Sequence, residues 1–336
     1  MKTKQIVVVG ATGRVGREIL SILSDIGVPT ENIVAIASER SAGLKLPYGS
    51  SSQLEVRNLA KFDFTGYDFA LFSAGSKISA EYAPKASAVG CVVIDNTSFF
   101  RMHDGIPLIV PEINFTDLSK YYSKIISNPN CSTIQMVMAL KPLHDAFGLK
   151  EVVVSTYQSV SGAGQKGVDE LMIQIEQVSA HKATEPHHFK KQIAFNLIPQ
   201  IDEFTDSLYT KEELKMINET RKIFNLPNLV ITATCVRVPV IVGHAVSVFA
   251  KFEKATDLSE ALSALRAFPG VKVVDNPNNF EYTTPLDVAS TNDVYVSRLR
   301  KHPDIENALS FWCVADNVRK GAALNTVQIA QMMAGE

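Results

Sequence analysis

Short, fully apolar runs alternate with longer stretches of helical spacing through the first 130 residues. Ile6–Val9, Ile33–Ala37 and Cys91–Asp95 are rich in β-branched residues, as is typical of strands buried on both faces of a parallel sheet. Tyr67–Ala74 also ends as a strand should, at Gly75. The intervening helices include a stripe formed by Val15, Ile19, Ile22, Leu23 and Ile26, and a second helix over Ser79–Val89. This alternation predicts an α/β unit.

The second half has a different pattern. We expect extended strands, antiparallel in character and separated by long connections, over Glu151–Gln158, Leu229–Pro239, His244–Phe252 and Val271–Val274. Helical spacing recurs over Gly167–Lys182, Lys211–Phe224 and Leu258–Ala267. Together these predict an α+β domain with one extended sheet. We place the first domain at residues 1–130, completed by a C-terminal helix at 317–336, and the second at 131–316.

Composition narrows the class of protein. The 336 residues exceed the size at which single cores stop growing, and 46% are apolar. The net charge of -2 gives no reason to expect nucleic acid or an anionic membrane as a partner. No apolar stretch approaches the roughly 20 residues of a membrane span, and no signal peptide opens the chain. Four separated cysteines form no CxxC pair. We therefore expect a soluble, cytoplasmic protein.

A glycine-rich turn joins the first strand to the first helix. Gly10, Gly13 and Gly16 follow the spacing G-x-x-G-x-x-G, which differs from the usual G-x-G-x-x-G of dinucleotide sites. In this context the main chain can approach a pyrophosphate, which the helix N-terminus then holds. A purely structural tight turn is the alternative.

The end of the second predicted strand bears on the choice of cofactor. In a Rossmann-like unit this position meets the adenosine ribose, where an acidic residue suits NAD and arginine suits the 2′-phosphate of NADP. Ser38, Arg40 and Ser41 favour NADP, whereas Glu39 could instead bind the ribose hydroxyls.

Cys131 is the leading candidate for covalent chemistry. It follows the turn Asn128-Pro129-Asn130 and precedes Ile134, Val137, Met138 and Leu140 at helical spacing. A thiol in the first turn of a helix faces open main-chain N–H groups, which favour the thiolate and can stabilise an oxyanion. The alternative is a small buried hydrophobe.

Several polar residues in the second half have both structural and functional interpretations. Arg237 lies in an apolar run, so it should face a pocket or an anion. His244 opens a strand and is more often structural there. Thr210 and Glu213 form a plausible capping box, which leaves Glu212, three residues before Lys215, without a structural explanation. Ser161–Gly167 is a second glycine-rich turn. The spacing of His181, His187 and His188 fits no metal site, and we expect none.

Five motifs in order resemble aspartate-semialdehyde dehydrogenase of the bacterial type over nearly the whole chain. They are Gly10–Gly16, Asn128–Thr133, Tyr157–Gly164, Arg237–Val240 with Gly243-His244, and Asn317–Ala323. Two related families differ at the cysteine: N-acetylglutamyl-phosphate reductase has a glycine before it, where this chain has Asn130, and glyceraldehyde-3-phosphate dehydrogenase has a Ser-Cys-Thr-Thr turn. Ala245 is a mild departure, because the family often has serine there.

The resemblance implies a fold and an activity. The fold is α/β, with a Rossmann-like NADP-binding domain and an α+β catalytic and dimerisation domain of the glyceraldehyde-3-phosphate dehydrogenase-like type. The activity is NADPH-dependent conversion of L-aspartyl 4-phosphate to L-aspartate 4-semialdehyde, in biosynthesis of lysine, threonine, methionine and diaminopimelate. The protein is expected to form a homodimer through the sheet of its second domain. An N-acetylglutamyl-phosphate reductase-like enzyme and a non-catalytic NADP-binding homologue are the alternatives.

The resemblance also implies roles for individual residues. Cys131 would be the nucleophile and His244 the acid/base. Substrate would be bound by Arg101, Asn130, Gln158, Glu212, Lys215 and Arg237. NADP would be bound by Gly10, Thr12, Gly13, Arg14, Val15, Gly16, Ser38, Arg40, Ser41, Ser161, Gly162 and Asn317.

Overall fold

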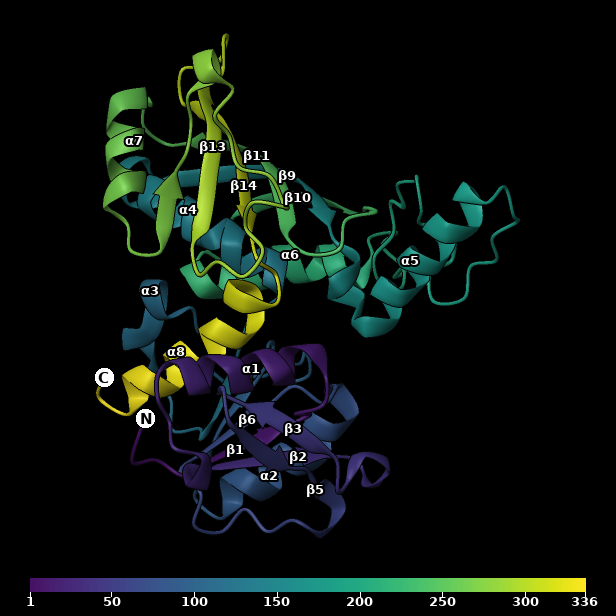
Figure 1. Ribbon diagram of the computed structural model, residues 1–336. Helices are drawn as coiled ribbons and strands as arrows, with labels where there is room; N and C mark the ends of the chain where they lie inside the picture. The colour runs from purple at the N-terminus through teal and green to yellow at the C-terminus, as the bar shows by residue number, and fades with distance from the viewer. The chain divides into compact units, whose positions relative to one another are not determined.

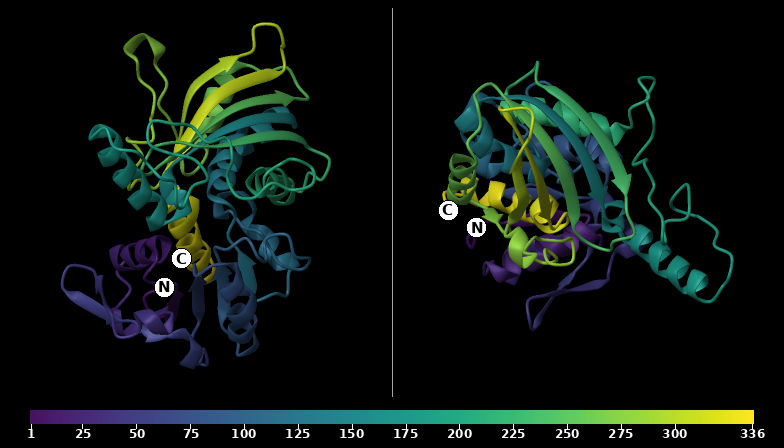
Figure 2. Two further views of the ribbon diagram at one scale, coloured as in Figure 1. Left: turned by 90° about the vertical axis from the view of Figure 1, so that its right-hand side faces the viewer. Right: turned by 90° about the horizontal axis from the view of Figure 1, so that it is seen from above.

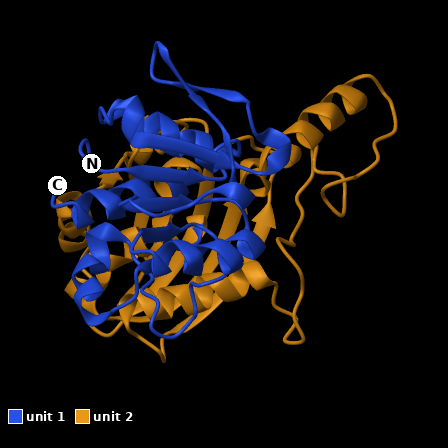
Figure 3. Ribbon diagram, turned by 90° about the horizontal axis from the view of Figure 1, so that it is seen from below, with its two compact units in different colours: residues 1–130, 322–336 blue, residues 131–321 orange.

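The computed structural model describes residues 1–336 as two compact units. Unit 1 comprises Met1–Asn130 and Ala322–Glu336, and unit 2 comprises Cys131–Gly321 (Figure 3). The chain returns to unit 1 at Ala322, whereas the sequence led us to expect this return at residue 317. The difference arises because Asn317–Gly321 cluster with unit 2. None of the helices in either unit combines the length and apolar character needed to cross a membrane.

Unit 1 is built on a six-stranded parallel sheet in the order β5-β2-β1-β6-β7-β8. Its strands are β1 (Ile6–Val9), β2 (Ile33–Ala37), β5 (Arg57–Asn58), β6 (Phe69–Phe72), β7 (Val92–Asp95) and β8 (Ile125–Ser127). Its helices are α1 (Arg14–Asp25), α2 (Ser76–Ala88), the single turn α3 (Pro111–Asn114) and α8 (Leu324–Met333). The chain order reverses between β1 and β6, where open α/β sheets bind ligands. The predicted Rossmann-like domain is confirmed.

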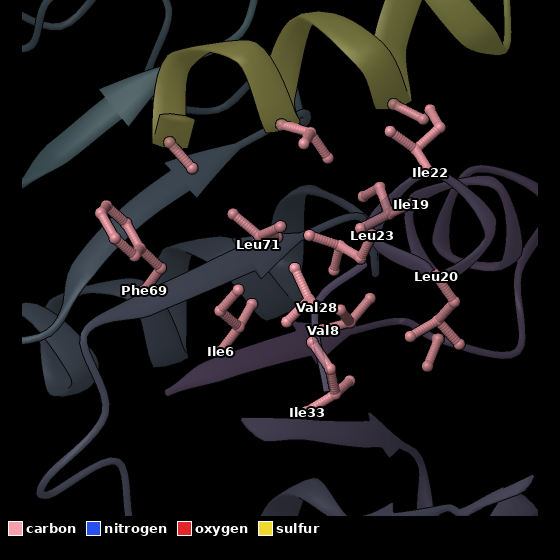
Figure 4. Packing of buried hydrophobic residues seen from close by; sticks show 14 of the residues in the cluster. Ile6, Val8, Ile19, Leu20, Ile22, Leu23, Val28, Ile33, Phe69 and Leu71 are labelled. Atoms are coloured by element: carbon pink, nitrogen blue, oxygen red, sulfur yellow. The ribbon is translucent and has the colours of Figure 1, made fainter. Parts of the chain in front are cut away.

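Alternate residues of β1 face two different cores. Ile6 and Val8 pack in one cluster with α1 and α8, whose apolar residues include Leu23 and Val327 (Figure 4). Val7 belongs to the opposite cluster, with Ala83 and other residues of α2. Because both faces are covered, every residue of β1 is buried, which explains its uninterrupted apolar sequence.

The sequence did not predict three short strands that follow β2. β3 (Lys45–Tyr48) and β4 (Ser52–Glu55) form an antiparallel hairpin, and β5 joins the edge of the main sheet. These strands are short and carry many exposed residues, so they lack the apolar pattern that identifies β1 and β2.

Unit 2 contains a six-stranded mixed sheet in the order β10-β9-β11-β14-β13-β12 (Figure 1). The strands are β9 (Leu149–Gln158), β10 (Val230–Arg237), β11 (His244–Phe252), β12 (Val271–Val273), β13 (Val294–Lys301) and β14 (Ala308–Ala315). The helices are α4 (Cys131–Phe147), α5 (Gln165–Ser179), α6 (Lys211–Phe224) and α7 (Leu258–Ala267). β13 and β14 were not predicted. The antiparallel expectation is wrong for β9–β10 and for β12–β13, which are parallel pairs.

Strand register brings distant residues to one end of this sheet. Gln158 pairs with Arg237 at the ends of the parallel strands β9 and β10. β11 runs antiparallel to β9, so its first residue, His244, lies at the same end, opposite Ala315 of β14. Residues up to 157 positions apart in sequence therefore lie at the same end of the sheet, which we call the polar end of the unit 2 sheet. In Figure 2, α5 and the loop after it extend away from this sheet.

Candidate active site

The glycine turn of unit 1 is close-packed at its glycines. Gly10 has φ of 88°, and its N–H and that of Ala11 donate to the Ile36 carbonyl. A Cβ built on Gly16 would lie 2.2 Å from the Gly10 carbonyl oxygen, so only glycine lets α1 pack this close to the turn. Gly13 caps α1 with no side-chain hydrogen bond. The geometry suits a pyrophosphate at the helix N-terminus and favours the dinucleotide interpretation over a purely structural turn.

The three residues expected to contact the ribose lie at the end of β2, in and beside a 3-10 turn, Glu39–Ser41. Ser38 and Arg40 are exposed, and Ser41 is half-buried. Glu39 is exposed as well, so both the guanidinium and the carboxylate can reach a ligand at this position.

The loop after β7 is held by a buried carboxylate. Asp95 accepts hydrogen bonds from Ser79 Oγ (2.7 Å) and from the N–H and hydroxyl of Thr97 (3.0 and 2.8 Å). Burial raises the pKa of Asp95, and these hydrogen bonds and the Arg101 charge oppose that rise. Arg101 is itself buried, donating from Nε to the Asn128 carbonyl (2.9 Å) and from Nη2 to the Asn96 carbonyl (2.8 Å). Main-chain carbonyl groups thus hold the guanidinium of Arg101, the side chain that we predicted to bind phosphate.

Cys131 is the first residue of α4, as the sequence predicted. It is the one partly exposed cysteine: Cys91, Cys235 and Cys313 are buried, and burial raises the pKa of each. A Cβ on Gly321 would lie 2.9 Å from the Cys131 Cβ, so the residue after Lys320 has to be small for the chain to pass this cysteine. Gly321 belongs to a five-residue π-helical turn, Arg319–Ala323.

A chain of polar contacts crosses the polar end of the unit 2 sheet. Gln158 accepts from Thr156 Oγ1 (2.9 Å) and donates from Nε2 to Glu212 Oε1 (3.0 Å). Glu212 Oε2 lies 3.1 Å from Lys215 Nζ, which is also 2.9 Å from Asp202 Oδ2. Burial lowers the pKa of Lys215, but the two carboxylates outweigh it and the pKa is raised. Lys215 is therefore a cation held between two anions.

Arg237 is buried at the end of β10. Its Nη1 donates to the Ser159 carbonyl (2.7 Å). Burial lowers the pKa of Arg237, while the charges of Glu212 and Cys131 raise it. A buried guanidinium that is influenced by the charges of Glu212 and Cys131 is what we expect of a residue that binds a substrate anion.

His244 is fully buried beside Arg237. Its Nδ1 accepts from the Ser159 N–H (3.0 Å), and its Nε2 has no hydrogen-bond partner. Burial, reinforced by the Arg237 charge, lowers its pKa to about 3, with Glu212 acting in the opposite direction. A buried, unpaired ring nitrogen next to an arginine is more typical of a catalytic histidine than of a structural one.

Gly162 explains how the two side chains converge. A Cβ at this position would lie 2.9 Å from both Arg237 Nη1 and His244 Nε2. The expected cofactor residues Ser161 and Asn317 lie nearby. Asn317 Oδ1 accepts from the Gly243 N–H (3.0 Å) and its Nδ2 donates to Ser161 Oγ (2.9 Å), so its side chain connects three loops. This structural role of Asn317 was not predicted from the sequence.

Other polar groups that the sequence singled out have structural roles. The capping box of Thr210 and Glu213 is confirmed, and Glu213 also accepts from the Cys235 N–H (3.1 Å). His187 and His188 donate main-chain N–H groups to the buried carboxylate of Glu170. No group of three or more His, Cys, Asp or Glu side chains in the structure could hold a metal ion.

Sequence reasoning missed Ser159, Asp202 and Gly321. Ser159 stands in a recognised motif, but its contact with His244 depends on strand register. Asp202 has φ of 68°, rare for a residue with a side chain, and no sequence pattern marks it. Gly321 follows Lys320 in the last motif, and the presence of a glycine there is the feature of the sequence that could have identified this position.

A glycine turn at the helix N-terminus of a Rossmann-like sheet, together with a cysteine at a helix N-terminus and histidine and arginine at one sheet end, fits the class of nicotinamide-dependent dehydrogenases. Residues 5–121 match the model of the semialdehyde dehydrogenase NAD binding domain, and residues 140–320 that of the semialdehyde dehydrogenase dimerisation domain.

Relatives over the full length agree with this class. Aspartate-semialdehyde dehydrogenase of Aquifex aeolicus is 48% identical over 335 residues, covering 99% of this chain and 98% of that protein. The Campylobacter jejuni enzyme is 48% identical, covering 98% and 97%. The crystal structure of Vibrio cholerae aspartate semialdehyde dehydrogenase II complexed with ASA superposes with a TM-score of 0.95 at 42% identity, covering 100% and 99%. The chain belongs to the aspartate-semialdehyde dehydrogenase family.

Proposed function

We propose that the protein reduces L-aspartyl 4-phosphate to L-aspartate 4-semialdehyde with release of phosphate, and catalyses the reverse phosphorylating oxidation. The observation that carries this proposal is the arrangement in unit 2, where Cys131 is the first residue of α4 and where Arg237 Nη1 and His244 Nε2 would both lie 2.9 Å from a Cβ on Gly162. We also propose that it acts in the cytoplasm in amino-acid biosynthesis. All four cysteines are free thiols, as is usual in a reducing compartment.

Cys131 carries the covalent step. Its sulfur attacks the acyl carbon, the C–O bond to phosphate breaks, and a thioester forms. The N–H groups at the start of α4 stabilise the oxyanion. When bound, the nicotinamide supplies the hydride that reduces the acyl group. His244 accepts the thiol proton and returns a proton when the semialdehyde leaves.

The polar end of the unit 2 sheet distinguishes the ends of the substrate. Arg237, helped by Gln158, binds the α-carboxylate through its planar fork of donors, and Glu212 binds the ammonium group. Lys215, Arg101 and Asn130 bind the phosphate. Because Asp202 already pairs with Lys215, phosphate has to compete with this carboxylate.

NADP is the cofactor that fits unit 1 best. The glycine turn accepts a pyrophosphate, and Arg40 is exposed beside the two hydroxyls of Ser38 and Ser41. A guanidinium can pair with a 2′-phosphate, whereas Glu39 alone would favour a free ribose.

The protein forms a homodimer through the helix-free face of the unit 2 sheet. α4, α6 and α7 pack on the sheet, and the residues of β9 that point the other way include the exposed Val153 and the half-buried Tyr157. Tyr157 packs against Trp312, with ring centroids 5.5 Å apart. Such an apolar sheet face suits a second copy. Val153→Lys should shift the sedimentation behaviour from dimer towards monomer, and an unchanged dimer would reject this surface.

A direct assay tests the function. Purified protein with L-aspartate semialdehyde, phosphate and NADP⁺ should produce NADPH in a phosphate-dependent reaction. Replacing the semialdehyde with N-acetylglutamate semialdehyde should abolish the signal. Activity with the acetylated compound alone would assign the chain to the related reductase, and no reduction with either would leave a cofactor-binding homologue.

A further inference from the structure

Ser159 is the first residue after β9, and its buried hydroxyl reaches three polar groups. The Oγ atom lies 3.0 Å from His244 Nδ1, 2.9 Å from Ser161 Oγ and 3.2 Å from Asn317 Oδ1. Ser159 also presents its main-chain N–H to the same histidine nitrogen at 3.0 Å. His244 Nδ1 therefore has two neighbours from one residue, of which the N–H can only donate and the hydroxyl can donate or accept.

Main-chain donors fix the direction of this network. The Gly243 N–H donates to Asn317 Oδ1, which orients the amide and leaves Nδ2 to donate to Ser161 Oγ (2.9 Å). The Ser159 N–H donates to His244 Nδ1, so this nitrogen carries no proton and the neutral ring holds its proton on Nε2.

This tautomer conflicts with the base role of His244. Nε2 can accept the Cys131 proton only when the proton of the neutral ring lies on Nδ1. An Nδ1–H cannot remain hydrogen-bonded to the Ser159 N–H, since both groups donate. The second atom within hydrogen-bond distance is Ser159 Oγ, which can accept while its own proton is donated to Asn317 Oδ1.

We propose that Ser159 is a positioning residue that switches His244 between its two tautomers, its hydroxyl accepting the Nδ1 proton whenever Nε2 acts as the base. This inference rests on the proposed function only for the base role of His244. The proton count balances in two steps: the neutral ring first exchanges protons with water, losing the proton on Nε2 and gaining one on Nδ1. The Cys131 S–H bond then breaks and Nε2–H forms, while Nδ1 and Ser159 each keep their proton. Burial and Arg237 oppose the resulting positive charge, whereas Glu212 and a main-chain hydrogen bond with Gly243 favour it. The Ser159 hydroxyl adds a further acceptor on the favourable side.

Alkylation of Cys131 by iodoacetamide tests the switch without any substrate. The other three cysteines are buried, so the reaction reports on Cys131. The variants are Ser159→Ala, which removes the hydroxyl but keeps the N–H, and Ser159→Thr, which keeps both. Ser263→Ala removes an exposed hydroxyl from α7 as a matched control.

We expect Ser159→Ala to slow alkylation at pH 7 and to lower kcat, each by about 10- to 100-fold, with the KM for NADP⁺ unchanged. Ser159→Thr should restore much of both rates. Histidine ¹⁵N spectra should show His244 as the Nε2–H tautomer in the wild type. A Ser159→Ala protein that keeps its melting temperature and matches the wild-type alkylation curve at every pH would overturn the inference. If instead the wild type lacks activity on aspartate semialdehyde but alkylation responds as expected, the substrate assignment fails and the switch stands.

Discussion

The glycine turn of unit 1 and the polar end of the unit 2 sheet are built in opposite ways. The turn uses seven consecutive residues, Gly10–Gly16, and its proposed contribution to cofactor binding comes from the main chain at the start of α1. The polar end collects side chains from β9, β10, β11, α6 and the segment after β14. The turn therefore depends mainly on the small volume of its glycines, whereas the polar end depends on the identity of each side chain.

The largest effect that this contrast predicts is at Cys131. Cys131→Ala should reduce turnover by about 10⁴-fold or more, because no other side chain can form the thioester. Binding of NADP⁺, measured by calorimetry, should stay within about twofold, since the glycine turn is untouched. Cys91→Ala removes a buried thiol from unit 1 and should leave turnover within an order of magnitude. Residual activity near wild type in Cys131→Ala would remove this residue from the mechanism.

The corresponding test of the turn is to add a methyl group at one of its glycines. In Gly16→Ala the new Cβ would lie 2.2 Å from the Gly10 oxygen and 2.8 Å from Ala11 Cα, so the free energy of unfolding should fall by about 2–4 kcal/mol and NADP⁺ affinity with it. Gly13→Ala places its Cβ 3.3 Å from the same oxygen and should cost less than about 1 kcal/mol. Urea unfolding of the pair measures the difference. Equal losses would show that helix packing does not set the glycine requirement.

Side-chain identity is tested at constant charge by Arg237→Lys. Lysine cannot reproduce the planar fork or keep both a substrate contact and the hydrogen bond to the Ser159 carbonyl. The KM for the semialdehyde should rise by about 10- to 100-fold, with little change in the KM for phosphate. Steady-state kinetics with each substrate varied in turn, with exposed Arg266→Lys as the control, would measure this. A larger effect on phosphate would exchange the proposed anion sites.

Burial of His244 should be visible in the pH dependence of stability. Its pKa of about 3 lies below the 6.5 of the unfolded chain, so the unfolded state binds the proton first as pH falls. The contribution of His244 is therefore complete above about pH 6.5 and is lost towards pH 3, by up to about 1.4 kcal/mol per pH unit. Unfolding free energies at pH 7.5, 6.5 and 5.5 should fall less steeply in His244→Asn than in the wild type. Parallel curves would mean that the ring titrates normally.

The smallest effect concerns the exposed rim of the turn. Arg40→Ala should raise the KM for NADP⁺ by about 10-fold and leave that for NAD⁺ nearly unchanged, because only NADP⁺ has the 2′-phosphate. Glu39→Ala is the matched control, and it should lower the KM for NAD⁺ only slightly. Equal increases for both cofactors in Arg40→Ala would favour Glu39 as the ribose ligand.

The same contrast explains what the sequence could predict. β1, β2 and α1 were predicted because they are continuous patterns, and α6, α7 and β11 match their predicted ranges. The position of Cys131 at the start of α4 is also local. The contact between Ser159 and His244 spans 85 positions and follows from register, which no single stretch encodes. β13 and β14 were missed because β14 is buried along most of its length and β13 contains a bulge, so neither alternates cleanly.

The way in which the chain divides has a consequence for biosynthesis and engineering. Unit 2 is an insertion within unit 1, entered at Cys131 and left at Gly321, and a Cβ on Gly321 would lie 2.9 Å from that of Cys131. Ends this close suit excision or circular permutation of the inserted domain. The host domain lacks Leu324, Val327 and Ile329 of its core until the whole inserted domain has been synthesised. The nucleotide-binding domain, although its synthesis begins first, therefore completes its core only after unit 2 has left the ribosome's active centre.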